Sequence, residues 1–95
     1  MINLTEGWKA HPGVPGGFYL AYMDTCIGEI SIVTGPKGSG LMGCNDPGRE
    51  TTYEAWFPGM SDPTGSLTLD ELKGIIKFMR QRIQEQERFE YEDDS

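Results

Sequence analysis

The sequence has few of the residues on which most enzymes and metal proteins depend. Its 95 residues include one histidine, two cysteines and eight basic side chains. Its apolar runs are short, whereas about 18 consecutive apolar residues are needed to cross a bilayer, so no membrane segment is expected. The N-terminus, Met-Ile-Asn-Leu-Thr-Glu-Gly-Trp, lacks the basic and apolar regions of a signal peptide. We therefore expect a soluble, cytoplasmic protein.

The scarcity of basic residues also limits the partners. Eight Lys and Arg stand against 15 Asp and Glu, giving a net charge of -7. A chain with this balance has no extended basic face, so direct nucleic-acid binding is not expected. Residues 85–95 hold six of the acidic side chains and one basic one, a net of -5 that leaves -2 for the remainder. We expect this acidic tail to be a solvated end, with an acidic ligand for a basic partner surface as the alternative.

Cysteine and histidine are too sparse and too widely spaced to predict a metal site or an active site. Cys26 and Cys44 are expected to be small buried hydrophobes, with an oxidisable pair or a reactive thiol as alternatives. His11 and the cysteines are separated by 15 and 18 residues, unlike the short spacings of zinc sites. No hydrolase, metalloprotease, thiol-redox or calcium-loop motif occurs. We therefore expect no cofactor and no enzymatic activity, and an enzyme using His11 is a distant alternative.

One stretch begins like a phosphate-binding loop. Residues 33–43 read VTGPKGSGLMG, a strand-like ending followed by G-x-x-x-x-G. A P-loop continues with Lys and then Ser or Thr, but Leu41 and Met42 occupy those positions. The glycines and proline that follow would stop a helix almost as soon as it began. The pattern favours a turn joining two strands in a hairpin over a nucleotide-triphosphate site.

Apolar alternation predicts a small sheet in the first part of the chain. Phe18, Leu20 and Tyr22 recur with period two, and the same parity continues through Ile30 and Ile32. The expected strands are residues 18–23, 26–34, 40–44 and 51–57. A turn at residues 24–25 would join the first two, and one long strand bent at Gly28 is the alternative.

A long helix is expected after the sheet. Thr68-Leu-Asp-Glu71 fits a capping box, and Leu67 is placed to pack on Leu72 as a hydrophobic staple. An apolar stripe with helical spacing then follows at Leu72, Ile75, Ile76, Met79 and Ile83. The helix should begin at residue 69, end near residue 88 and cover one face of the sheet, while Phe78 lies off the stripe as a possible oligomer contact.

These elements predict one α+β domain over residues 1–95: a mainly antiparallel sheet of about four strands in sequence order, backed by the C-terminal helix. The expected segments are an N-terminal segment with a Gly/Pro loop (1–17), the sheet (18–57), the helix (66–88) and the acidic tail (89–95). A chain of this size buries only about 60% of its unfolded surface. Because the outer sheet face and the edges also need cover, we expect a homo-oligomer.

Aromatic residues outside the expected core point to binding. Trp8 and the loop 11–17, together with Trp56 on the outer sheet face, form the predicted recognition surface. The alternative is that a second subunit, or the N-terminal segment folding back, covers these aromatics. The main hypothesis is a non-catalytic protein that occupies a protein partner's surface, as small acidic inhibitors of phages and mobile elements do. The alternative is a sponge-like binder of a small anionic ligand or nucleotide at a subunit interface. Across both hypotheses, the candidate binding residues are Trp8, His11, Tyr22, Lys37, Arg49 and Trp56.

Overall fold

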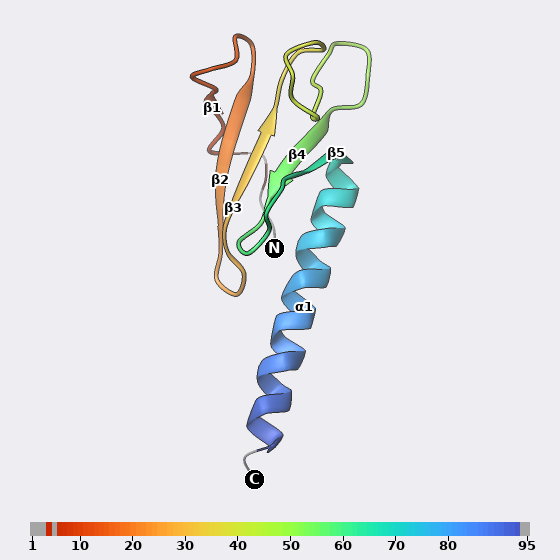
Figure 1. Ribbon diagram of the computed structural model, residues 1–95. Helices are drawn as coiled ribbons and strands as arrows, with labels where there is room; N and C mark the ends of the chain where they lie inside the picture. Colours follow the sequence, from red (N-terminus) through yellow and green to blue (C-terminus); the bar gives the residue numbers. More distant parts are fainter. Residues whose placement is uncertain (1–3, 5, 94–95) are drawn as a thin grey trace.

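The computed structural model describes Leu4 and residues 6–93, with side chains through Glu87. Within this part of the chain, five strands form one antiparallel sheet in chain order, and one helix follows them (Figure 1). The elements are β1 (Lys9–Ala10), β2 (Phe18–Asp24), β3 (Gly28–Thr34), β4 (Thr52–Trp56), β5 (Thr64–Thr68) and α1 (Leu69–Asp93). The expected α+β fold, a sheet in sequence order followed by a helix, is confirmed.

The β2–β3 hairpin follows the apolar alternation of the sequence. Leu20 lies opposite Ile32 in the register, and all the even-numbered positions of these strands point to one face. That face is the core face, because Leu20, Ile30 and Ile32 are all buried. The turn occupies residues 25–27, and Gly28 enters β3 with a φ of 107° that favours glycine. The chain therefore forms two strands, and the alternative of one long bent strand is wrong.

The sheet differs from expectation at three places. β1 is only two residues long, too short for any periodic pattern. β5 begins directly after Pro63, outside the expected sheet and overlapping the start of the expected helix segment (66–88), and its Ser66 has a φ of 53°. No strand forms at residues 40–44 in the described chain, so the hairpin expected there is also absent. This segment has one isolated parallel bridge, between Gly35 and Cys44. Periodicity could not reveal these differences, since each depends on pairing between distant segments.

The capping box forms as expected at the start of α1. Glu71 N–H donates to Thr68 Oγ1 over 3.2 Å, and Thr68 N–H donates to Glu71 Oε1 over 2.9 Å. Leu67, Leu72 and Ile76 are buried in the same apolar cluster, so the predicted stripe does face the sheet. The helix continues to Asp93, beyond the predicted end near residue 88, and it therefore includes part of the predicted tail. Residues 94–95 lie outside the described chain.

Two segments share the cover of the core face. α1 lies over β4 and β5, and the N-terminal segment brings Leu4 into the same buried cluster. Trp8 packs against this cluster and stacks on Tyr53, with 5.6 Å between the ring centroids. Its indole N–H donates to the Leu4 carbonyl oxygen over 2.7 Å, which fixes the direction of the segment. The opposite face of the sheet carries the exposed side chains of Met23 and Trp56.

The helix is longer than the sheet that it covers. Figure 1 shows α1 continuing past the β2–β3 turn, with its C-terminal half beside no strand. The molecule is accordingly elongated, with principal extents of 55 × 23 × 23 Å. Among the described residues, no helix combines the length and the apolar character needed to cross a membrane.

Candidate functional site

Two loops meet at the end of the sheet where β2 begins and β3 ends. The first, residues 11–17, is closed by hydrogen bonds from His11 N–H to Gly17 O and from Gly17 N–H to Val14 O, each 2.9 Å long. The second, residues 35–51, is tied to the strands by Asn45 N–H bonded to Gly35 O over 3.0 Å and by a reciprocal pair between Cys44 and Thr52. Because these backbone N–H and C=O groups are hydrogen-bonded within the protein, the two glycine-rich loops hold fixed positions beside the sheet.

Where the loops meet the sheet there is a shallow cleft of about 620 Å³, mostly apolar and widely open to solvent. We call it the Trp8 cleft, and its lining residues are Trp8, Gly16, Phe18, Thr34, Pro36, Asn45, Asp46 and Pro47. Two aromatic rings and two prolines supply rigid apolar walls that lose little conformational entropy on binding. Such a surface is suited to apolar side chains.

The polar groups of the Trp8 cleft are held in place by the surrounding backbone. Thr34 Oγ1 donates to Thr52 O over 2.9 Å, and Asn45 Nδ2 donates to Gly16 O over 3.4 Å. Asp46 Oδ1 accepts from Lys37 N–H over 2.9 Å. The Asp46 carboxylate has a second oxygen with which to accept a hydrogen bond from a bound group.

Trp8 lines the cleft with one side of its ring and packs against the core with the other. The Tyr53 ring lies beneath it with an interplanar angle of 29°. Burial raises the pKa of the Tyr53 hydroxyl above its usual value of 10.0, so this ring is uncharged at neutral pH. The indole is thus half-buried and fixed in direction, as expected of a preorganised binding side chain.

A smaller hollow of about 250 Å³ adjoins the Trp8 cleft and shares Pro36 with it. Val14, Lys37 and Ser39 line this hollow together with glycines of the two loops. Ser39 Oγ is buried and has no hydrogen-bond partner among the described residues. Lys37, one of the predicted binding residues, therefore lies beside the cleft.

The other predicted binding residues are dispersed over the molecule. Trp56 projects from the face opposite Trp8, so the two tryptophans do not share a surface. His11 packs its ring edge-on to Tyr19, and its Nδ1 accepts from Gly13 N–H over 3.1 Å. Tyr22 lies on the core face towards the far end of β2. Arg49 is exposed in the second loop.

Sequence reasoning missed most of the lining of the cleft. Phe18 was assigned to the core face by its parity, but it lies at the end of the strand and remains 44% exposed. Pro36, Asp46 and Pro47 are not among the predicted binding residues, although all three line the cleft. A proline-rich and glycine-rich loop on either side of an exposed aromatic is a usable signal for such a cleft, although it does not identify which loops meet.

Gly43 supports the second loop, and replacing it with alanine is expected to destabilise the protein by about 2 kcal/mol. A Cβ at this position would lie 2.8 Å from Tyr53 Cα and 2.9 Å from Glu54 N, and these backbone atoms of β4 cannot rotate away. Gly74→Ala is the matched control, because no atom lies within 4 Å of its Cβ and alanine favours a helix by about 1 kcal/mol. Urea unfolding followed by circular dichroism should show opposite shifts for the two variants, and equal shifts would contradict the prediction.

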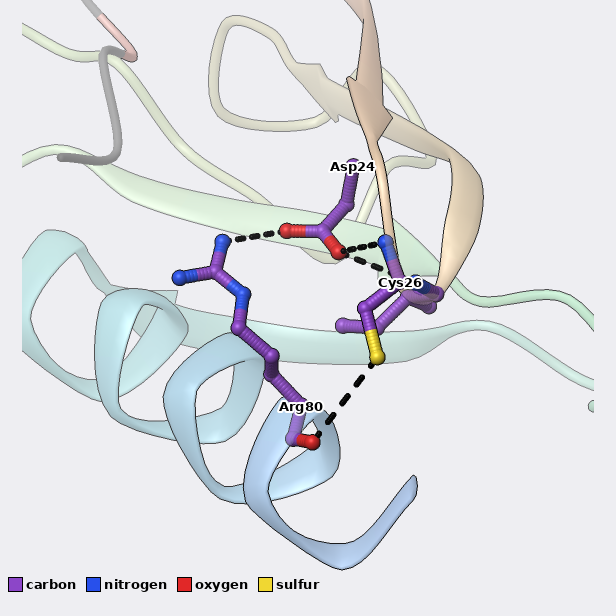
Figure 2. A network of polar contacts seen from close by, with 4 residues as sticks. Asp24, Cys26 and Arg80 are labelled. Atoms are coloured by element: carbon purple, nitrogen blue, oxygen red, sulfur yellow. Dashed lines mark hydrogen bonds and ion pairs between the residues drawn. The ribbon is translucent and has the colours of Figure 1, made fainter. Parts of the chain in front are cut away.

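A second polar network, which the sequence did not reveal, joins the β2–β3 turn to α1 (Figure 2). Asp24 Oδ1 accepts from Cys26 N–H over 2.8 Å and from Ile27 N–H over 2.9 Å, while Oδ2 forms an ion pair with Arg80. The Cys26 thiol donates to Arg80 O over 3.9 Å. Burial alone would raise the pKa of Asp24, but the Arg80 guanidinium and the two N–H groups outweigh it and hold the pKa below 3.8.

The two cysteines are both free thiols and half-buried, as small packed side chains rather than a disulfide. Among the described residues, no group of three histidine, cysteine, aspartate or glutamate side chains is placed to hold a metal ion. Comparisons with known proteins find no matching family, no matching curated protein and no matching solved structure. Function is therefore inferred from the geometry and the chemistry of the chain itself.

Proposed function

We propose that the protein is a non-catalytic binding protein that holds an apolar segment of a protein partner in the Trp8 cleft. The observation that carries this proposal is the cleft itself, where Trp8, Phe18 and two prolines line an apolar surface between two hydrogen-bonded loops. Aromatic side chains that are rigid and only partly exposed are typical anchors of protein interfaces. Occupying a partner's surface requires no catalytic group, in agreement with the sparse chemistry of the sequence.

The shape of the cleft favours a protein segment over a small molecule. A small-molecule pocket usually encloses 70–90% or more of its ligand, whereas the Trp8 cleft is widely open to solvent. A segment that remains attached to a larger partner needs only to bury the side chains that enter the cleft. Asp46 lies at the rim to accept a hydrogen bond from the segment's backbone or from a basic side chain.

A small anionic ligand is the second candidate. It is favoured by the adjoining hollow, where Lys37 and the buried, unpartnered Ser39 Oγ lie together within the described chain. Gly38 and Gly40 have φ values of 85° and 92°, which turn backbone N–H groups into the short concave arrangements that bind anions. Lys37 is exposed, so any anion there would remain largely hydrated.

Phe18→Ala should weaken partner binding by at least about thirtyfold, and Trp56→Ala should leave it unchanged. The two side chains are 44% and 40% exposed, so neither substitution should unfold the domain, but only Phe18 lines the cleft. Loss of a hot-spot aromatic weakens an interface by at least about thirtyfold. A partner recovered from a lysate with the wild-type chain would be titrated against both variants by calorimetry. Binding that depends on Trp56 and is indifferent to Phe18 would contradict the cleft.

The two tryptophans allow the cleft to be observed directly. In a Trp56→Phe background, the remaining indole is Trp8, and its emission should shift as the recovered partner saturates the cleft. The same variant titrated with ATP and with inorganic phosphate tests the second candidate. Saturable binding of either anion without a partner protein would favour the small-ligand function instead.

A further inference from the structure

The C-terminal half of α1 extends beyond the rest of the molecule. Arg80 forms an ion pair with Asp24 and accepts a hydrogen bond from the Cys26 thiol, both at the β2–β3 turn. Residues 81–93, here called the projecting half, continue past Arg80 without a strand beside them (Figure 1). Thirteen helical residues span about 20 Å. Isolated helices of this length are marginal in water, so packing against another surface would stabilise the projecting half.

The charges of α1 are separated along its length. Residues 73–82 contain four basic side chains and no acidic one, whereas residues 85–93 contain five acidic side chains and only Arg88 as a base. The last turn has no basic residue, although a helix C-terminus favours positive charge. The acidic half therefore keeps a net negative charge, and the basic half is the complement that a second copy would bring.

These charges are complementary in one specific arrangement of two helices. When two copies of α1 run antiparallel and cross between Ile83 and Gln84, Arg82 of each helix lies level with position 85 of the other, which is Glu85. A parallel pair would place like charges together. The sequence of the helix is thus self-complementary for antiparallel pairing.

An exposed aromatic lies on the same face as Arg82 and Glu85. Phe78 is 61% exposed, and the Arg82 guanidinium carbon lies 6.0 Å from the centre of its ring. Phe78, Arg82 and Glu85 are spaced by four and three residues, so they share one helix face, away from the stripe of Leu72 and Ile76 that packs on the sheet. The antiparallel crossing brings Phe78 level with position 89, which is also a phenylalanine.

We propose that this face of α1 is a self-association surface, on which the helix of a second copy packs antiparallel. The pairing buries Phe78, matches Arg82 with Glu85 twice because of the two-fold symmetry, and supports both projecting halves. The two sheets lie at opposite ends of the helix pair. The inference is independent of the Trp8 cleft, which lies at the end of the sheet away from the projecting half.

The mass of the protein in solution tests the proposal. Sedimentation equilibrium of the wild-type chain should give twice the mass of one chain at micromolar concentration, and Phe78→Ala should shift the protein to monomers. Met23→Ala is the matched control, because Met23 is 66% exposed on the outer sheet face and its loss should leave the dimer intact. A wild-type chain that stays monomeric up to 100 micromolar, or a dimer lost only with Met23→Ala, would overturn the proposal.

Charge reversal tests the antiparallel register. Arg82→Glu and Glu85→Arg should each raise the dissociation constant of the homodimer by about tenfold or more, because each replaces two attractive pairs with two repulsive ones. An equimolar mixture of the two variants should restore association as a heterodimer, since every 82–85 contact then joins opposite charges. Circular dichroism of each variant confirms that the helix is retained. Homodimers of unchanged affinity would exclude this face as the contact.

Discussion

Replacing Asp24 with alanine is expected to lower the free energy of unfolding by about 3 kcal/mol. The Asp24 side chain is 1% exposed and serves two elements at once, since it closes the β2–β3 turn and binds Arg80 on α1. Its removal leaves the N–H groups of Cys26 and Ile27 without their acceptor, and unpaired buried donors cost about 1–3 kcal/mol each. Arg80 is partly exposed and recovers some hydration, which keeps the total near the lower end of this sum.

Urea unfolding measures this effect, with Asp62→Ala as the control. Asp62 is an exposed loop carboxylate, and its loss should change stability by less than about 0.5 kcal/mol. Asp24→Asn separates the two roles, because the amide oxygen still accepts the turn N–H groups while the ion pair with Arg80 is lost. We expect an intermediate loss for asparagine. An alanine variant as stable as the control would show that the network contributes nothing.

The contribution of Asp24 should also depend on pH. Its pKa is held below 3.8 in the folded protein by Arg80 and by the turn N–H groups. A carboxyl with a depressed folded-state pKa stabilises the protein fully above its unfolded-state pKa and loses that contribution as the pH falls through the folded value. The stability difference between wild type and Asp24→Asn should therefore be constant near neutral pH and shrink below pH 4.

Phe57→Ala is expected to cost about 4 kcal/mol. Phe57 is 1% exposed, directly follows β4, and is the largest of the fully buried side chains among the described residues. Loss of the ring would leave a cavity in the buried cluster that includes Ile30 and Leu72. The hydrogen-bonded strands and the capped helix hold these side chains in place, so they cannot move inwards to fill it.

The neighbouring Trp56 provides the control for this substitution. Trp56 is 40% exposed on the opposite face, and Trp56→Ala should cost less than about 1 kcal/mol although it removes a larger side chain. Thermal unfolding of the two single variants compares burial directly at adjacent positions. Similar costs for both would mean that the outer face is also packed in solution, and that a second copy or a partner covers Trp56.

Local patterns in the sequence predicted the elements whose stabilising interactions are themselves local. The β2–β3 hairpin follows from two-residue alternation, and the start of α1 follows from the reciprocal bonds of Thr68 and Glu71. β5 was missed because its pairing with β4 overrides a segment that begins next to Pro63 and contains a strained Ser66. Its stability comes from a neighbouring strand, and no pattern within residues 64–68 encodes that neighbour.

The candidate site was only partly predictable for the same reason. Trp8 and Lys37 were selected for their chemistry, and the structure places them at the cleft and the adjoining hollow. The walls of the cleft come from segments that are distant in the chain, so their meeting depends on the whole sheet. Asp24 did leave a signal, because its parity with Leu20 and Tyr22 puts a carboxylate on the core face. A charged residue at such a position requires a partner, but the helix offers four bases over residues 73–82, so the sequence alone does not identify Arg80.

The Asp24–Arg80 ion pair divides α1 into a part that packs on the sheet and a part that extends beyond it. Between the capping box at Thr68 and the ion pair at Arg80, the helix is bonded to the sheet domain, so we expect its amide protons to exchange with solvent mainly through global unfolding. Past Arg80, α1 lies beside no strand, so we expect faster exchange there without opening of the sheet. A partner that packs on this end of the helix would therefore stabilise it without altering the sheet.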